Sequence, residues 1–360
     1  MKILITGGHV TPALAVIDEL ISNEKQQVLF VGRKHALLFD KEQSYEYQQI
    51  TKLGIKFVNL NAGRLTRSIN LISFINILFI PIGFIQAFFI VLRYRPDRVL
   101  SFGGYLGLPV VMASFLLRIS VIIHEQTLKP GIANRLSGLF AKYILLSFPE
   151  TKTAFSGNKT IITGNPLRQS LLNTTNHSDF IRKPKQKIIY ITGGSLGSKT
   201  INKLIEEILP LLTKDFFVIH QCGSYNNNEN YNRLISYKKG NYLVKPHFDD
   251  WQVGQIYKKA NLVIGRSGAN TVMELIAFQL PSILIPLSIA SFQEQREQAL
   301  LLKTAGAAEI LSDERSSKEL YQIIKTMDAD LNKYKNNFSK LMFYYHPDAA
   351  KKIISILMND

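Results

Sequence analysis

The chain has 360 residues, of which 46% are hydrophobic and 19% charged, and its formal net charge is +16 at pH 7. This length and composition predict a globular protein of two domains with ample core. The single cysteine, Cys222, excludes a disulfide framework and a cysteine-rich zinc site, and it fits a reducing compartment. The basic residues are scattered and form no nucleic-acid-binding motif, so a phosphorylated substrate or an anionic membrane surface is favoured over nucleic acid.

The chain opens with a buried strand, a glycine turn and a helix over residues 2–20, and residues 187–209 repeat this plan. No secretory signal is expected at the N-terminus. The tetrapeptide ITGG closes the strand both times, at residues 5–8 and 191–194. The repeat predicts an α/β chain with two Rossmann-like domains, each built on a parallel sheet. Further strands are expected at 27–31, 56–60, 98–101, 120–124, 143–147, 160–163, 216–221, 242–245, 261–264, 282–285 and 309–311.

Residues 69–92 form a long apolar run without a charged residue. Its length fits a membrane-spanning helix, but Pro81 and Gly83 interrupt it and it lies between strands of one sheet. We therefore expect a broken helix pair that covers the sheet. Its outward face is a candidate apolar surface for membrane contact, because basic residues flank it at Arg64, Arg67, Arg93 and Arg95.

Three polar or terminal segments complete the expected organisation. Residues 173–187 carry no apolar period and predict a linker between the two halves. Residues 225–232 are rich in asparagine and predict a mobile loop. Residues 318–358 predict terminal helices.

Residues 262–275 predict a strand, a tight turn and a helix whose first N–H groups favour an anion. Glu274 lies one turn into that helix, where its carboxylate could reach the hydroxyls of a ribose. The same residues permit a second interpretation, in which Thr271 and Glu274 form a capping box at the helix start. These residues alone leave both interpretations open.

Other candidate site residues follow strands of the predicted sheets. His9 comes after a glycine turn and is either catalytic or structural. Residues 193–198 have the composition of a phosphate-binding loop, and Arg168 is a cation at the domain junction or a surface arginine. We find no metal-ligand spacing, so a diphosphate leaving group would be stabilised by N–H groups, helix dipoles and arginine. The absence of a GxGxxG motif after the first strand argues against a nicotinamide dinucleotide.

Several motifs, taken in their order and spacing over nearly the whole chain, resemble the MurG family. They are ITGGHVTPALAV, SFGGYLGLP, HEQTLKPGIAN, ITGNPLR, ITGGSLGSKTIN, IHQCG and IGRSGANTVMEL, followed by QREQA at 295–299 and AGAA at 305–308. The resemblance implies a GT-B fold, with two Rossmann-like domains whose parallel sheets face each other across a cleft. It also implies an acceptor domain at 1–165, a UDP-sugar domain at 166–340 and a C-terminal helix at 341–360 that packs back on the first domain.

The resemblance assigns roles to residues of both halves. It implies that Ser195 and its glycines approach the UDP diphosphate, that the Phe248 backbone lies near uracil, and that Glu274 binds the ribose. The donor-binding set it implies is Arg168, Gly194, Ser195, Gly197, Phe248, Ala269, Asn270, Thr271, Glu274 and Gln295. The acceptor-binding set is Thr6, Gly7, Gly8, Gly104, Tyr105, Glu125, Gln126 and Thr127, with His9 as the candidate catalytic base.

This chain departs from the family pattern at three places. The family's glycine turn GGGTGGH is shortened to TGGH at residues 6–9, which leaves fewer N–H groups for an acceptor pyrophosphate. Thr127 replaces the asparagine of the family's HEQN motif, so a hydroxyl stands where an amide is usual. The loop before Gln295 reads LSIASFQE and lacks the usual Asp-His or Asp-Arg pair.

The resemblance implies an inverting glycosyltransferase that moves N-acetylglucosamine from UDP to undecaprenyl-pyrophosphoryl-muramyl-pentapeptide, converting lipid I to lipid II. No metal or other cofactor is expected. The expected partners are UDP-N-acetylglucosamine, the lipid-linked acceptor and the anionic cytoplasmic face of the membrane, with peripheral attachment and no nucleic acid. Two alternatives stay open: another GT-B enzyme on the same nucleotide sugar, such as an epimerase or hydrolase, and a catalytically impaired UDP-sugar-binding protein.

Overall fold

The computed structural model describes residues 1–21, 26–35, 43–63, 71–175, 177–181, 184–194, 196–237, 240–287 and 293–359, with the backbone alone at 71–78 and 225–227. The chain forms two compact units. One unit comprises Met1–Arg168 together with His346–Asp360, and the other comprises Gln169–Tyr345. The chain therefore crosses from one unit to the other twice.

The first unit is built on a sheet of seven parallel strands in the order β3-β2-β1-β4-β5-β6-β7. Each expected strand of this half is present, and the ends differ from expectation by at most one residue. The strands are β1 (Lys2–Thr6), β2 (Gln27–Gly32), β3 (Lys56–Asn59), β4 (Arg98–Ser101), β5 (Ser120–Glu125), β6 (Tyr143–Leu146) and β7 (Thr160–Ile162).

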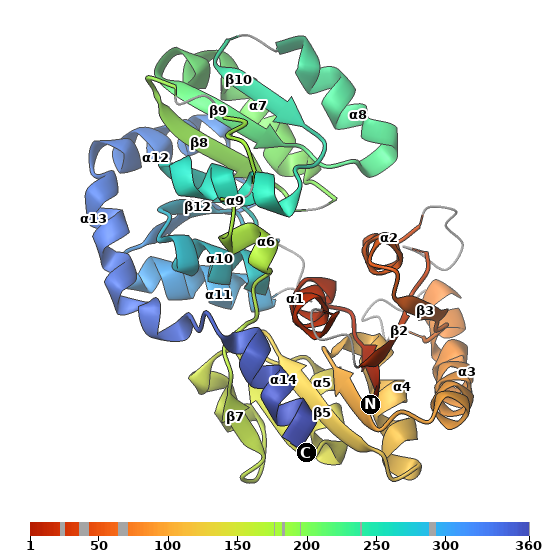
Figure 1. Cartoon of the computed structure of the whole chain (residues 1–360). Coiled ribbons are helices and arrows are strands. Elements are labelled where there is room, and N and C mark those ends of the chain that lie inside the picture. The colour runs from red at the N-terminus through yellow and green to blue at the C-terminus, as the bar shows by residue number, and fades with distance from the viewer. Residues whose placement is uncertain are drawn as a thin grey trace. The chain divides into compact units, whose positions relative to one another are not determined.

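Helices cover both faces of this sheet (Figure 1). Side chains alternate along β1, so Ile3 and Ile5 pack in one core while Leu4 packs in the other. The C-terminal helix α14 belongs to this unit and packs against α1 through Ile353 and Leu357. The helices are α1 (Val10–Ile21), α2 (Tyr45–Lys52), α3 (Leu71–Tyr94), α4 (Gly104–Leu116), α5 (Ile132–Phe140), the short 3-10 helix η1 (Pro149–Ala154) and α14 (Ala349–Asn359).

The helix α3 corrects one expectation, because it runs unbroken through Pro81 and is not a broken pair. Proline in a helix interior costs about 3 kcal/mol, and contacts with the loop after β3 offset this cost. Gly83 lies so close to Ala62 that a Cβ there would be 2.7 Å from the Ala62 Cα atom. The Gln86 amide accepts from the Asn61 N–H and donates to the Asn59 carbonyl. Among the described residues, no helix is long and apolar enough to cross a membrane.

The second unit is built on six parallel strands in the order β10-β9-β8-β11-β12-β13. The expected strands of this half are all present, with ends again within one residue. The strands are β8 (Lys187–Thr192), β9 (Phe216–Gln221), β10 (Tyr242–Lys245), β11 (Leu262–Gly265), β12 (Ser282–Leu284) and β13 (Ala308–Ile310).

Helix α8 of the second unit corrects a second expectation. Residues 225–232 were expected to form a loop, but they lie in helix α8, which Leu234 anchors in the core. An ion pair of 2.9 Å between Arg233 and Glu206 also fastens α8 to α7. The helices are α6 (Gln169–Leu172), α7 (Lys199–Asp215), α8 (Tyr225–Leu234), α9 (Asp250–Lys259), α10 (Ala269–Phe278), α11 (Gln293–Ala305), α12 (Ser317–Ala329) and α13 (Leu331–Asn336), with the 3-10 helices η2 (Ile235–Tyr237), η4 (Asn337–Lys340) and η5 (Met342–Tyr344).

Candidate functional site

The predicted site residues gather at the carboxyl ends of the strands, where parallel α/β sheets bind their ligands. They form one cluster in each unit. The acceptor-binding candidates and His9 lie in the first unit, at the ends of β1, β4 and β5. The described donor-binding candidates lie in the second unit, at the ends of β8, β10, β11 and β12, except for Arg168.

The glycine turn after β1 packs directly on the turn after β4. The Gly8 N–H donates to the Gly103 carbonyl at 2.9 Å. Gly7 has a φ of +143°, and a Cβ there would lie 2.7 Å from the Phe102 carbonyl carbon. Gly104 has a φ of +75° and opens helix α4 beside Gly8. The close approach of the two turns explains why both consist of glycine.

His124 and Gln126 hold the end of β5 from inside the first unit. The Gln126 amide Nε2 donates to Nδ1 of His124, and Nε2 of His124 in turn lies 3.0 Å from the Gly164 carbonyl. This pairing makes His124 neutral with its proton on Nε2, and burial lowers the pKa of His124 to about 4. Gln126 is fully buried, and its Nε2 bonds to His124 inside the first unit. Its Oε1 atom has no hydrogen-bond partner among the described residues.

Glu125 is the centre of a second buried cluster. Its Oε1 accepts hydrogen bonds from the Thr127 N–H at 2.8 Å and from the Thr127 hydroxyl at 2.7 Å. Its Oε2 accepts from the Asn134 amide at 2.6 Å. Thr127 is only 4% exposed, so the hydroxyl that replaces the family's amide is used inside the loop. Asn134 was not predicted as a site residue, although it ends the HEQTLKPGIAN motif.

His9 follows the glycine turn and immediately precedes helix α1, and it is partly exposed. Burial lowers the pKa of His9, and the negative charge of Glu125 opposes that shift. A lowered pKa keeps the imidazole neutral at physiological pH. The neutral form is the one that can accept a proton, so this environment is compatible with a general base.

The glycine loop of the second unit joins β8 to helix α7. Gly194 and Gly197 both have positive φ angles, of +85° and +80°. A Cβ on Gly197 would lie 2.2 Å from the Cys222 carbonyl oxygen, so only glycine fits there. Ser198 caps α7 by accepting from the Ile201 N–H, so the helix begins directly after the glycine loop. Ser195 lies outside the described residues.

Gln221, at the end of β9, connects this loop with Phe248. Its Nε2 donates to the Gly194 carbonyl at 3.3 Å, and its Oε1 accepts from the Phe248 N–H at 3.0 Å. Gln221 is 5% exposed and Phe248 is fully buried. Gln221 was not predicted as a site residue, although it belongs to the IHQCG motif. The two loops to which the resemblance assigns the diphosphate and the uracil are thus held by one amide.

The start of helix α10 tests the capping interpretation of Glu274, while its role at the ribose stays a prediction. The helix begins at Ala269 with Gly268 as its N-cap, so Asn270 and Thr271 lie within the first turn and Thr271 caps nothing. The Glu274 carboxylate accepts a hydrogen bond of 2.9 Å from the Tyr257 hydroxyl on α9. Burial raises the pKa of Glu274 to about 7, although the Tyr257 bond opposes the shift. The capping interpretation is therefore wrong.

Two glutamines of α11 complete the second cluster. Gln295 accepts from the Leu287 N–H through its side chain and from the Ser267 hydroxyl through its carbonyl. These contacts tie α11 to the end of β12 and to the turn before α10. Gln298 belongs to the QREQA motif, and the resemblance assigns it no role. It is 1% exposed, and neither of its amide atoms has a hydrogen-bond partner among the described residues.

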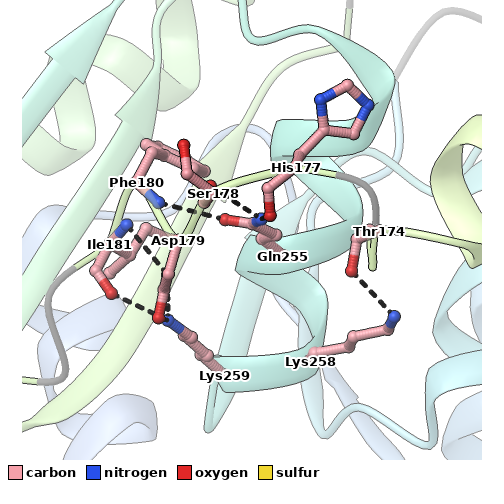
Figure 2. Close-up of polar contacts among 9 residues, drawn as sticks. All are labelled: Thr174, His177, Ser178, Asp179, Phe180, Ile181, Gln255, Lys258 and Lys259. Carbon is pink, nitrogen blue, oxygen red and sulfur yellow. Dashed lines mark hydrogen bonds and ion pairs between the residues drawn. The ribbon is translucent and has the colours of Figure 1, made fainter.

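Residues of the segment predicted as a linker between the two halves are attached to helix α9, as Figure 2 shows. Gln255 accepts from the Phe180 N–H and donates to the carbonyls of His177 and Ser178. The His177 ring stacks on Trp251 with centroids 4.3 Å apart. The attached residues belong to the second unit. The buried Gln255 amide takes the place of water as the hydrogen-bond partner of their backbone.

Further contacts extend this attachment along α9. Lys258 donates to Thr174 at 2.8 Å, and Lys259 pairs with Asp179 and with the Ile181 carbonyl (Figure 2). The Phe180 ring in turn packs against Phe248.

Arg168 ends the first unit. Its Nε donates to Oδ2 of Asp18 on α1 at 3.0 Å. The expected role of Arg168 in donor binding stays a prediction.

Comparison with known proteins identifies the chain's relatives. Residues 6–146 match the glycosyltransferase family 28 N-terminal domain, and residues 188–353 match the glycosyltransferase family 28 C-terminal domain. A protein of Clostridium botulinum strain Langeland is 34% identical over 349 residues, which cover 94% of each chain. A protein of Clostridium perfringens strain ATCC 13124 is 33% identical over 93% of this chain and 92% of its own. Both are named UDP-N-acetylglucosamine–N-acetylmuramyl-(pentapeptide) pyrophosphoryl-undecaprenol N-acetylglucosamine transferase.

Solved structures agree with this relationship. The crystal structure of Acinetobacter baumannii MurG has a TM-score of 0.70 and 25% identity, and the match covers 100% of this chain and 99% of that chain. A UDP-GlcNAc 2-epimerase from Neisseria meningitidis has a TM-score of 0.67 at 17% identity and covers 100% of both chains, which shows a shared fold alone. The chain therefore belongs to glycosyltransferase family 28 and, within it, to the MurG family with its GT-B fold.

Proposed function

We propose that this protein transfers N-acetylglucosamine from UDP-N-acetylglucosamine to the muramyl sugar of undecaprenyl-linked lipid I, which gives lipid II. The observation that carries the proposal is the relationship over 94% of both chains to transferases named for this reaction. The two residue clusters at the strand ends support it, because each lies in the unit to which the resemblance assigns its substrate.

In the reaction, the acceptor's hydroxyl attacks the anomeric carbon from the face opposite UDP. A carbon–oxygen bond forms to the acceptor, the bond to the UDP oxygen breaks, and the configuration inverts. His9 takes the hydroxyl proton, because its lowered pKa keeps the imidazole neutral and free to accept. The negative charge of nearby Glu125 then stabilises the imidazolium.

The donor is held by the second cluster. The ionised Glu274 carboxylate accepts hydrogen bonds from the ribose hydroxyls while Tyr257 fixes its orientation. The loop with Gly194 and Gly197, at the start of the 17-residue helix α7, stabilises the departing diphosphate through N–H groups and the helix dipole. We expect this stabilisation to need no metal ion.

Membrane attachment is a further part of the proposal. Helices α3, α4 and α5 pack side by side and expose large apolar side chains, including Phe89 at 62% and Ile132 at 67% exposure. We call this surface the apolar face; its other members are Ile82, Ile85, Leu92, Phe115, Leu116, Leu136 and Leu139. Exposed basic residues accompany it at Arg93, Arg95, Arg118, Arg135 and Lys142. Apolar side chains among cations suit the surface of an anionic membrane.

The test is transfer of labelled N-acetylglucosamine to a lipid I analogue in the presence of a chelator. Labelled product that forms only with the acceptor present supports the transferase and its independence from metal. Release of UDP without acceptor would instead indicate a hydrolase or an epimerase. Tight binding of the nucleotide sugar without turnover would indicate a catalytically impaired protein.

A further inference from the structure

Arg33 emerges from the first sheet beside the shortened glycine turn. In the parallel pairing of β1 with β2, Thr6 lies opposite Val31. Arg33 and the Gly7–Gly8 turn therefore both follow the carboxyl ends of neighbouring strands, at the same edge of the sheet. Arg33 reaches the neighbourhood of the shortened turn through Tyr105, which follows Gly104, and a Cβ on Gly104 would lie 3.2 Å from the Gly8 nitrogen.

The Arg33 side chain spans the end of β1. Its Nη1 donates to the Tyr105 hydroxyl at 3.0 Å. Tyr105 lies in the first turn of α4, which follows β4, and β1 lies between β2 and β4 in the sheet. A hydrogen bond from the residue after β2 to the helix after β4 thus reaches across the strand that ends in the Gly7–Gly8 turn.

The backbone of Arg33 is fixed from both sides. Its N–H donates to the Glu46 carboxylate, and its carbonyl accepts from the Ser44 hydroxyl. The next N–H, that of Lys34, donates to the Asn59 side chain at 2.8 Å. These bonds fix the point from which the guanidinium extends, so binding a ligand would order only the side chain.

The described residues leave the charge of Arg33 available to an anion. In the described part of the chain its guanidinium bonds to a neutral phenol and forms no ion pair. The nearby carboxyl belongs to Glu46, and burial raises the pKa of Glu46 to about 7. Glu46 is therefore partly protonated at neutral pH and cancels the arginine's charge incompletely.

Other groups at the same edge also suit an anion. Helices α1 and α4, of 12 and 13 residues, both begin there, and the α4 N-cap Gly103 makes no side-chain capping bond. Thr6 lies directly before the turn and is fully buried. Its hydroxyl oxygen has no hydrogen-bond partner among the described residues. A buried hydroxyl without a partner at two adjacent helix starts is an observation independent of Arg33.

We infer that Arg33 binds the diphosphate of the lipid-linked acceptor and supplies the positive charge that offsets the shortened turn. Arginine suits this role because its planar guanidinium can donate two hydrogen bonds to phosphate oxygens. Tyr105 acts through Arg33 as a positioning residue. The inference rests on the proposed function, since the diphosphate belongs to that acceptor.

The test compares Arg33→Met and Arg33→Lys with wild-type protein in steady-state transfer assays. We expect Arg33→Met to raise the acceptor KM about tenfold or more and to leave the donor KM within twofold. Arg33→Lys should retain part of the affinity because it keeps the charge. Tyr105→Phe should raise the acceptor KM less than Arg33→Met does. Arg315→Met, an exposed arginine of the second unit, is the matched control and should match wild type.

Inorganic pyrophosphate supplies a second readout. At saturating donor it should compete with the acceptor in wild-type protein, and Arg33→Met should weaken that inhibition about as much as it raises the acceptor KM. Restoring a GGGTGGH turn in Arg33→Met should recover acceptor affinity. An unchanged acceptor KM, or an equal rise in both KM values, would overturn the role of Arg33. Failure of the proposed function is distinguishable, because wild-type protein would then transfer nothing.

Discussion

The Tyr257 hydroxyl donates a hydrogen bond of 2.9 Å to Oε2 of Glu274, and this bond joins helices α9 and α10 of the second unit. Tyr257 is 3% exposed; its ring packs edge-on against Tyr190 and at a tilt against Phe278. Tyr190 in turn contacts Phe248. The proposed ribose and uracil contacts are thus supported by one buried aromatic cluster.

The affinity for UDP should depend on pH through Glu274. Its pKa of about 7 leaves the carboxyl partly protonated at neutral pH, and only the ionised form can accept from both ribose hydroxyls. The Kd for UDP should therefore fall as pH rises from 6 to 8, and Glu274→Gln should bind weakly with a flat profile. Calorimetric titration at several pH values checks this; an equally steep profile in Glu274→Gln would reject the assignment.

Glu274→Gln should also stabilise the unliganded protein. Because the folded-state pKa is raised above the ordinary value of 4.5, the carboxyl destabilises the fold increasingly as pH rises from about 4.5 to 7. The amide removes this effect, so the variant should gain up to about 3 kcal/mol at pH 8 and little at pH 4.5. Thermal unfolding without nucleotide measures the difference. A variant less stable than wild type at pH 8 contradicts the argument.

The attachment of the predicted linker to α9 should influence nucleotide binding. Gln255→Glu places a carboxylate oxygen beside the carbonyls of His177 and Ser178, which would release the segment that holds Phe180 against Phe248. Losing about 1 kcal/mol of hydrogen bonding should weaken UDP binding roughly fivefold. Gln322→Glu, an exposed position in the same unit, provides the control. Equal UDP affinities of the two variants would show that the attachment is irrelevant to the nucleotide.

Removing the His9 imidazole should affect chemistry and spare donor binding. His9→Ala should lower kcat at least a hundredfold and leave the Kd for UDP within twofold. In wild-type protein kcat at saturating donor and acceptor should stay constant through neutral pH and fall only at a pH below 6.5, because burial lowers the pKa of the base from that value. Single-turnover kinetics and calorimetry separate the two effects. Comparable losses in rate and UDP affinity would remove His9 from the role of base.

The apolar face should bind anionic vesicles. Replacing Phe89 and Leu136 by Glu exchanges apolar contact for repulsion, and each change should weaken binding about tenfold or more. Phe343→Glu is a matched control, since Phe343 is 60% exposed and lies in the second unit. Vesicle sedimentation at low and high salt measures the partition. If the control loses as much binding as the Phe89→Glu and Leu136→Glu variants, another surface carries the attachment.

Local sequence patterns predicted the strands and glycine turns because their causes are local. An apolar run ending in glycine is enough to place β8 and its loop, and the same holds for β11 and the turn before α10. Helix α8 escaped prediction because its asparagines have low helix propensity, while its anchors Leu234 and Arg233 act through the tertiary fold. Pro81 led to the wrong prediction of a broken helix, since contacts between α3 and the loop after β3 also depend on the tertiary fold.

The positions of the candidate residues at the strand ends were predictable, but their supporting contacts were not. Glu274 could be chosen from its place in the motif, yet its partner Tyr257 lies 17 residues away on another helix. Gln221 and Gln255 connect loops that come together only when the sheet is formed. The shortened turn was visible in the sequence, whereas the position of Arg33 depends on the strand order β2-β1-β4 and on its bond to Tyr105. Such pairs depend on tertiary structure, which periodicity does not encode.

The most direct test of the proposed activity is the stoichiometry of UDP release with and without the lipid-linked acceptor. We expect one UDP released for each N-acetylglucosamine transferred, with no release when the acceptor is omitted, in chelator throughout. Sustained UDP release without acceptor, or no transfer despite saturable binding of UDP-N-acetylglucosamine, would contradict the proposed transferase activity.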